Sequence, residues 1–126
     1  MTSGTSKKSE LKLIGVARSS LEELLLDYKD FLRLRELLLW PKDHPKAEYI
    51  RKLAYVENRS YQTYKSYVED KSAETAANTV ICLIHQANYL LDKQLAQIAE
   101  QFLEEGGFTE RLYRVRRIRR SQPPKT

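Results

Sequence analysis

The sequence predicts an all-α protein: a helical bundle of two long helices with short connecting helices and a C-terminal basic helix. Three observations favour this fold. The 126 residues are 41% hydrophobic and 31% charged, which suits one small domain with a single core. Only four glycines and four prolines are present, too few for the many tight turns of a β-protein. Apolar residues recur at three- and four-residue spacing, and no alternating pattern indicates a strand.

The first long helix is predicted to begin near Thr5 and Ser6, because either residue can cap a helix N-terminus. No Gly or Pro interrupts it between Gly15 and Trp40-Pro41, so we expect a helix of roughly 30 residues, about 45 Å long. Its apolar stripe is Ile14, Ala17, Leu21, Leu24, Tyr28 and Phe31, widened by Leu11, Leu25 and Leu32.

Two shorter helices are predicted next. Residues 41–45 form a connector, and Asp43 is available to cap a helix from Pro45 to about Glu57. Residues 60–71 form a third helical piece, in which tyrosines recur every three residues with Val68 on the same face: Tyr61, Tyr64 and Tyr67. These rings could stack on unpaired bases, but one packing face needs the same spacing, and packing is the favoured interpretation.

Ser72 is predicted to cap the second long helix, and Gly106 to end it as a C-terminal glycine. The apolar stripe of this helix is Ala77, Ile81, Ile84, Ala87, Leu91, Leu95, Ile98 and Phe102. Thr109 is then expected to cap a last helix. The predicted organisation is a helical bundle domain over residues 1–107, a basic C-terminal helix over 108–120 and a disordered tail over 121–126.

The charge of the chain reverses at Gly106-Gly107. Residues 72–108 carry one base, Lys93, against five acids, whereas residues 109–126 carry seven bases and one acid. The net charge of +5 and the pI near 9.3 therefore arise largely at the C-terminus. Charge-poor helices pack against other elements, while clustered arginines bind phosphate or carboxylate, so the reversal separates a packing element from a contact element.

The arginine-rich segment is the candidate nucleic-acid-binding site. In a helix, Leu112, Val115 and Ile118 share one face, and four of the arginines lie opposite with Tyr113 among them. Arginine binds phosphate oxygens bidentately, and tyrosine can stack on a base. In the second interpretation, the arginines contact an acidic protein surface. In the third, their role is structural, either as a solubilising tail or as partners of Glu100, Glu104 and Glu105. The candidate residues are Arg111, Tyr113, Arg114, Arg116, Arg117, Arg119 and Arg120.

No pattern indicates catalysis, a cofactor, a metal site or a membrane span. His44, His85 and Cys82 are the only soft ligands, too few for zinc, and a structural or solvent-facing role is favoured for His85. Phosphate-binding loops, nucleophile elbows and paired carboxylates are absent from the sequence. The longest uncharged run, residues 75–91, includes Asn78 and Asn88, which disfavours lipid. A single cysteine and an N-terminus unlike a secretory signal favour a reduced, cytoplasmic protein.

Several strings resemble a bacterial four-helix-bundle family. Gly4-Thr-Ser-Lys-Lys-Ser-Glu-Leu-Lys-Leu and Val16-Ala-Arg-Ser-Ser-Leu-Glu-Glu-Leu-Leu resemble its third helix. Ser72-Ala-Glu-Thr-Ala-Ala-Asn, Ile81-Cys-Leu-Ile-His-Gln-Ala-Asn-Tyr-Leu-Leu-Asp and Gly106-Gly-Phe-Thr-Glu-Arg-Leu-Tyr-Arg resemble the suffix domain of some members. The family comprises proteins of ribosomal-RNA intervening sequences and accessory variability proteins of diversity-generating retroelements. The resemblance implies an oligomeric bundle whose basic surface binds nucleic acid and, in the retroelement members, a reverse transcriptase.

The chain departs from this family at its start, because the usual N-terminal helical hairpin has no counterpart here. Two long helices with apolar stripes cannot close a four-helix core alone. A second copy, or a helical partner chain supplying the hairpin, is therefore expected; the chain could also be a truncated family member. The sequence predicts a non-enzymatic accessory module that oligomerises or docks with a helical partner and binds RNA or DNA. The alternative is a protein interaction adaptor without nucleic-acid binding.

Overall fold

A computed structural model of the chain describes the backbone of residues 4–69 and 71–121, and the side chains of residues 6–69 and 71–104. The elements are α1 (Gly4–Leu34), α2 (Pro45–Lys52), the 3-10 turn η1 (Leu53–Tyr55), α3 (Tyr61–Glu69) and α4 (Ala73–Ser121). No described residue lies in a strand. The predicted all-α fold, with two long helices and short connecting ones, is confirmed.

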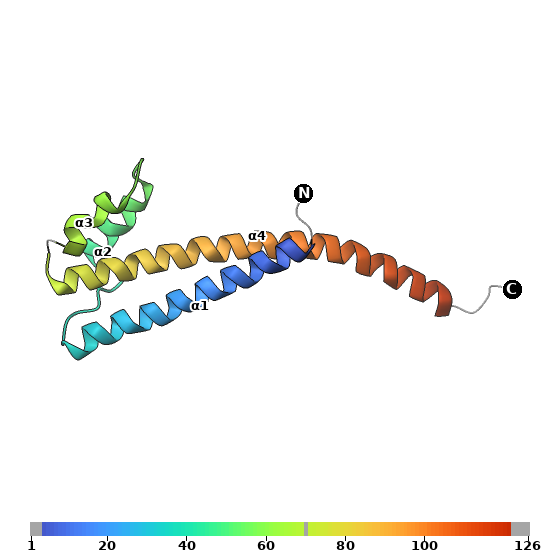
Figure 1. The fold of residues 1–126 in the computed structure, drawn as a ribbon, viewed down its shortest axis with the longest axis horizontal. Coiled ribbons are helices and arrows are strands. Elements are labelled where there is room, and N and C mark those ends of the chain that lie inside the picture. The colour runs from blue at the N-terminus through green and yellow to red at the C-terminus, as the bar shows by residue number, and fades with distance from the viewer. Residues whose placement is uncertain (1–3, 70, 122–126) are drawn as a thin grey trace.

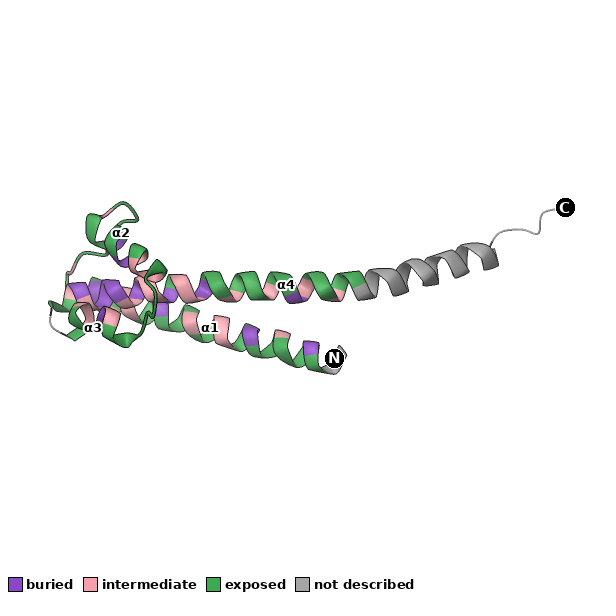
Figure 2. Ribbon diagram, turned by 90° about the horizontal axis from the view of Figure 1, so that it is seen from above, coloured by how far each residue is buried: buried purple, intermediate pink, exposed green. Residues whose placement is uncertain are grey.

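Helix α4 is the central element of the fold. It runs antiparallel to α1, and its N-terminal part also contacts α2 and α3 (Figure 1). Burial follows this arrangement, since the buried residues of α4 gather in the part that α2 and α3 cover (Figure 2). The short helices therefore complete one end of the hairpin that α1 and α4 form.

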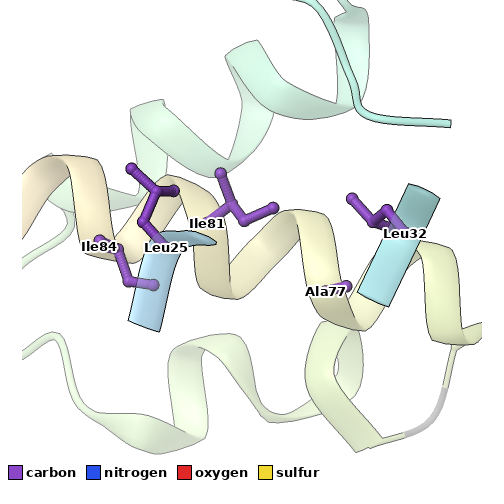
Figure 3. Close-up of a cluster of buried hydrophobic side chains, with 5 residues drawn as sticks. All are labelled: Leu25, Leu32, Ala77, Ile81 and Ile84. Carbon is purple, nitrogen blue, oxygen red and sulfur yellow. The ribbon is translucent and has the colours of Figure 1, made fainter. Parts of the chain in front are cut away.

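Two apolar clusters hold these contacts. The first joins α1 to α4 through Leu25, Leu32, Ala77, Ile81 and Ile84 (Figure 3). The second is made by Trp40, Ala47, Ile50 and Tyr64, and Cys82 and Leu83 of α4 pack against it. Tyr64 is buried and Tyr67 packs on this cluster, whereas Tyr61 is exposed. Packing is thus the observed role of two of the three tyrosines.

The interface between α1 and α4 follows a seven-residue repeat. Leu25 and Leu32 of α1 are seven positions apart, as are Ala77 and Ile84 of α4, and all four are buried. This repeat is typical of helices that pack as a coiled coil. The predicted stripe of α1 is wrong at Leu24, which is 41% exposed because Leu25 occupies the buried register.

Helix α1 ends at Leu34, earlier than the predicted stop at Trp40. Glu36 adopts a left-handed conformation with φ 56° and donates its N–H to the Arg33 carbonyl, while Leu37 donates to the Leu32 carbonyl at 2.9 Å. This pair of bonds is a Schellman motif, which satisfies carbonyls at a helix end. Leu37 then packs against the cluster that contains Leu32, so tertiary packing overrides the helix propensity of the following leucines.

The caps of the later helices agree with prediction in one case and differ in another. The Ser72 hydroxyl accepts from the Thr75 N–H at 3.2 Å, which confirms the predicted cap of α4. At α2 the predicted cap Asp43 is wrong, because His44 Nδ1 accepts from the Lys46 N–H at 3.1 Å. His44 is held there by stacking on Trp40, with the ring centroids 4.9 Å apart.

The predicted helix end at Gly106 is wrong, and so is the separate helix capped by Thr109. Helix α4 continues without interruption through both glycines to Ser121. A glycine inside a helix costs about 1 kcal/mol relative to alanine, which a long helix rich in leucine, glutamate and arginine can absorb. The charge reversal therefore occurs within one helix.

Candidate partner and nucleic-acid interfaces

The predicted contact residues lie on the C-terminal part of α4. Figure 1 shows this part of the helix continuing past the end of α1, with no other described element beside it. The candidates Arg111, Tyr113, Arg114, Arg116, Arg117, Arg119 and Arg120 all belong to this helix. Their side chains lie outside the described residues, so the predicted arginine and apolar faces stay a prediction.

The apolar repeat of α4 stops beside the N-terminal end of the antiparallel helix α1. Ile98 is the last buried residue of the repeat and Phe102 is half-buried. The same register then reaches Glu105, Thr109 and Leu112, followed by two arginines. Because the register turns polar beyond Phe102, the last part of α4 is not patterned to pack against another helix as α1 does.

An apolar groove of about 290 Å³ lies between α1 and α4 near the end that α3 covers. The groove exists because the α4 residues that line it are mostly alanines with small side chains. Asp27 is the one charged side chain in the lining. The lining residues are Asp27, Tyr28, Phe31, Val68, Ala73, Ala76, Ala77 and Val80. A surface of this composition favours an apolar occupant.

The apolar surface continues from this groove along α1. Leu24 lies seven positions before Phe31 and Leu13 eleven positions before Leu24, so the three share one helix face. Leu13 is 68% exposed. We call these three residues the apolar strip. It lies beside the α4-facing stripe, where a further helix of a bundle would pack.

A bidentate ion pair joins α1 to α4. Arg18 donates from Nε to Asp92 Oδ1 at 2.8 Å and from Nη2 to Asp92 Oδ2 at 3.3 Å. Its second partner is Glu22 of α1, which accepts from Arg18 Nη1. The hydrogen bonds to Asp92 and then to Glu22 raise the pKa of Arg18. Exposed ion pairs contribute little free energy, so this contact adds little to the stability of the α1–α4 packing.

The described residues assemble no metal-binding set. Over residues 6–69 and 71–104, no three His, Cys, Asp or Glu side chains lie close enough to hold a metal ion. Burial, and then Lys29, lower the pKa of His85, and burial raises the pKa of the Cys82 thiol. His85 is an exposed residue of α4, and the part of its ring that the protein covers accounts for the effect of burial on its pKa. In the same part of the chain, no helix combines the length and apolar character needed to cross a membrane.

A second basic surface was not predicted from the sequence. It is a hollow of about 520 Å³ between α4 and the segment that runs from α2 through η1 to Arg59, and we call it the basic hollow. Its lining comes from two segments far apart in the chain, so no local spacing reveals it. The lining residues are Arg51, Ala54, Tyr55, Arg59, Cys82, His85, Gln86, Tyr89, Leu90 and Lys93.

Comparison of the chain with protein-family models, curated proteins and solved structures finds no match. The membership of the four-helix-bundle family therefore stays a prediction that rests on the short sequence segments quoted above.

Proposed function

We propose that this chain is a non-enzymatic, cytoplasmic helical module that packs with a further helix and binds RNA or DNA through its arginine-rich C-terminus. The further helix belongs to a second copy or to a helical partner chain. One observation carries the proposal: α4 packs against α1, then continues past it into a segment with six arginines between positions 111 and 120. The family resemblance adds an accessory role in a diversity-generating retroelement, with a reverse transcriptase as the partner to test.

The projecting part of α4 suits contact with phosphates. Residues 105–120 extend about 24 Å at 1.5 Å per residue, and each strand of B-DNA presents a phosphate for every 3.4 Å of the helix axis. Four phosphate contacts would give a log-log salt slope of about −3 to −4, depending on whether the ligand is single or double stranded. Phosphate contacts carry little sequence information, so we expect sequence-tolerant binding.

The nucleic-acid test is fluorescence anisotropy with labelled single- and double-stranded oligonucleotides over a salt series. The terminal variant carries glutamine at Arg114, Arg116, Arg117 and Arg120. The control variant removes the same charge from exposed positions elsewhere, with glutamine at Lys8, Lys12, Arg33 and Lys65. We expect the terminal variant to lose most of the salt slope and the control to keep it. Equally weak binding by wild type and terminal variant at low salt would favour the adaptor function, in which the arginines contact an acidic protein.

Self-association is tested by sedimentation at tens of micromolar. The strip variant carries lysine at Leu13 and Leu24. Its control carries lysine at Leu26 and Leu34, which are 60% and 73% exposed and lie outside the strip. Burying one leucine contributes about 1.5–3 kcal/mol, so the strip variant should weaken association at least tenfold. The control should associate like wild type. A compact wild-type monomer would remove self-association and leave docking with a separate helical chain.

A further inference from the structure

The basic hollow carries positive charge that the described residues do not neutralise. Three of its ten lining residues are bases and none is acidic. Arg51 donates to the Lys42 carbonyl at 2.6 Å, and Arg59 donates to the Ala54 carbonyl at 3.2 Å. These acceptors are neutral, so they orient the two guanidinium groups and leave the charge available. Among the described arginines, Arg18 and Arg33 are instead paired with carboxylates.

The positive surface extends beyond the hollow itself. A neighbouring hollow of about 370 Å³ shares Arg51, Cys82 and His85 with it and adds Lys29 and Lys42. A third hollow, of about 410 Å³, brings Glu48 together with Arg51 and Lys52. Bases thus outnumber acids across the connected surface, which favours an anionic ligand.

Two tyrosines stand in the wall of the hollow with little cover. Tyr55 of η1 is 89% exposed and Tyr89 of α4 is 62% exposed, so neither ring contributes much to the core. Lys93 Nζ lies 5.5 Å from the centre of the Tyr89 ring. Exposed aromatic rings among arginine and lysine side chains form the usual surface that binds an unpaired nucleobase and its phosphate.

A buried donor in the same wall has no acceptor within the described structure. Gln86 Oε1 accepts from Arg59 Nη1 at 3.4 Å, which fixes the orientation of the amide. Its Nε2 atom is buried without a hydrogen-bond partner among the described residues. A buried donor without an acceptor is unfavourable. A phosphate oxygen or a base carbonyl in the hollow would satisfy it once the Gln86 side chain turns to bring the covered Nε2 to the surface.

We propose that the basic hollow binds a nucleotide unit, its phosphate against Arg51, Arg59 and Lys93 and its base against Tyr55 and Tyr89. The base must be unpaired, because a duplex hides its faces from a tyrosine. Two sources supply this chemistry: a single strand of RNA or DNA, and a free nucleotide. For a strand, the inference rests on the proposed function and adds a contact on the body of the molecule.

The test uses the full chain and a labelled twelve-nucleotide single strand, oligo-dT or oligo-rU, over a salt series. The hollow variant combines Tyr89→Ala with Lys93→Gln, two exposed residues four positions apart on α4. The matched control combines Tyr61→Ala with Lys65→Gln, an exposed tyrosine and lysine with the same spacing on α3. Circular dichroism checks that both variants keep their helicity.

We expect Tyr89→Ala to weaken binding about 5- to 150-fold, the range for one lost base stack. Lys93→Gln should reduce the log-log salt slope for a single strand by about 0.7. A duplex should be insensitive to Tyr89→Ala, and the control variant should bind like wild type. Equal affinity of hollow variant, control and wild type for the single strand would overturn the inference.

The source is identified with AMP and UMP. Displacement of the strand by either nucleotide, with NMR shifts at the Gln86 amide and Tyr89, supports a free nucleotide. Shifts with the strand alone support a nucleic acid. No shift at these residues with any of the three ligands refutes the site.

The terminal variant separates this inference from the proposed function. Loss of binding in the terminal variant, with normal binding by the hollow variant, refutes the inference and keeps the proposed function. The reverse result refutes binding through the C-terminus and keeps the hollow. Crosslinking of a 4-thiouridine strand to wild type gives a measurement without any substitution. Crosslinks at Tyr55 or Tyr89 support the hollow, and crosslinks confined to residues 105–121 refute it.

Discussion

Replacing the two buried asparagines of α4 by leucine should have opposite effects on stability. Asn78 is 2% exposed, and its Oδ1 accepts from the Trp40 N–H at 2.8 Å. Its Nδ2 donates to the carbonyls of Leu38 and Glu74, each at 2.8 Å. Asn88 is 6% exposed, yet its Oδ1 is buried without a donor among the described residues. One amide therefore fastens the loop before α2, and the other interrupts the apolar repeat.

The size of each effect follows from the partners left behind. Asn78→Leu leaves the Trp40 N–H and the Leu38 carbonyl unpaired, and each buried unpaired group costs about 1–3 kcal/mol. Apolar burial of the leucine offsets part of this, so we expect a net loss of about 2–4 kcal/mol. Asn88→Leu removes an unsatisfied acceptor and adds apolar burial, so we expect a gain of about 1–2 kcal/mol.

The assay is urea unfolding of the full chain. Trp40, the only tryptophan, reports on its contact with α4 by fluorescence, and circular dichroism reports on the helices. Alanine variants at both positions remove the same atoms, so the difference between their unfolding free energies isolates the hydrogen bonds. The reasoning is refuted if Asn78→Leu is neutral, or if Asn88→Leu destabilises the protein by more than about 1 kcal/mol.

Three further predictions concern backbone strain and charge. Glu36→Gly should stabilise the chain by about 0.5–1 kcal/mol in urea unfolding, because glycine adopts the left-handed conformation without strain. Gly106→Ala and Gly107→Ala should each raise helicity by circular dichroism, whereas a turn at these positions would make them destabilising. His85 should titrate by NMR below the ordinary value of about 6.5, because burial and Lys29 lower its pKa. The unfolded chain then binds this proton more readily than the folded chain. The free energy of unfolding should therefore fall as the pH drops below about 6.5, and His85→Gln should lessen this loss of stability.

The spacing of apolar residues predicted the long helices because packing demands it. Leu32, Ala77 and Ile81 carry the repeat and are buried as expected. The sequence did not predict the end of α1, because the segment 35–40 consists of good helix formers. Its course depends on Trp40 reaching Asn78, a contact 38 residues away in the chain.

The reversal of charge was visible in the sequence, but the glycine pair at the reversal, Gly106-Gly107, was wrongly predicted to end the helix. A glycine pair ends a helix only where the next residues gain contacts by turning back. In the structure, α4 instead continues past α1 as one helix.

The basic hollow was not predicted from the sequence for a different reason. Arg51 and Lys93 are 42 positions apart and become neighbours only when α2 packs on α4.

The continuity of α4 sets a length for any strand that contacts both basic surfaces. Lys93 and Arg114 are 21 positions apart on one helix, which is about 32 Å at 1.5 Å per residue. A strand that keeps the stacked rise of B-DNA, 3.4 Å of helix axis per phosphate, needs about ten nucleotides to cover this distance, and an extended single strand needs fewer. Shorter strands can occupy one surface at a time, whereas longer ones gain the effective concentration of a second contact. Affinity for a series of four to sixteen nucleotides should therefore rise steeply at or below about ten nucleotides, and the hollow variant should flatten that rise. A smooth increase in wild type, in proportion to length, would mean that the two surfaces do not share one strand.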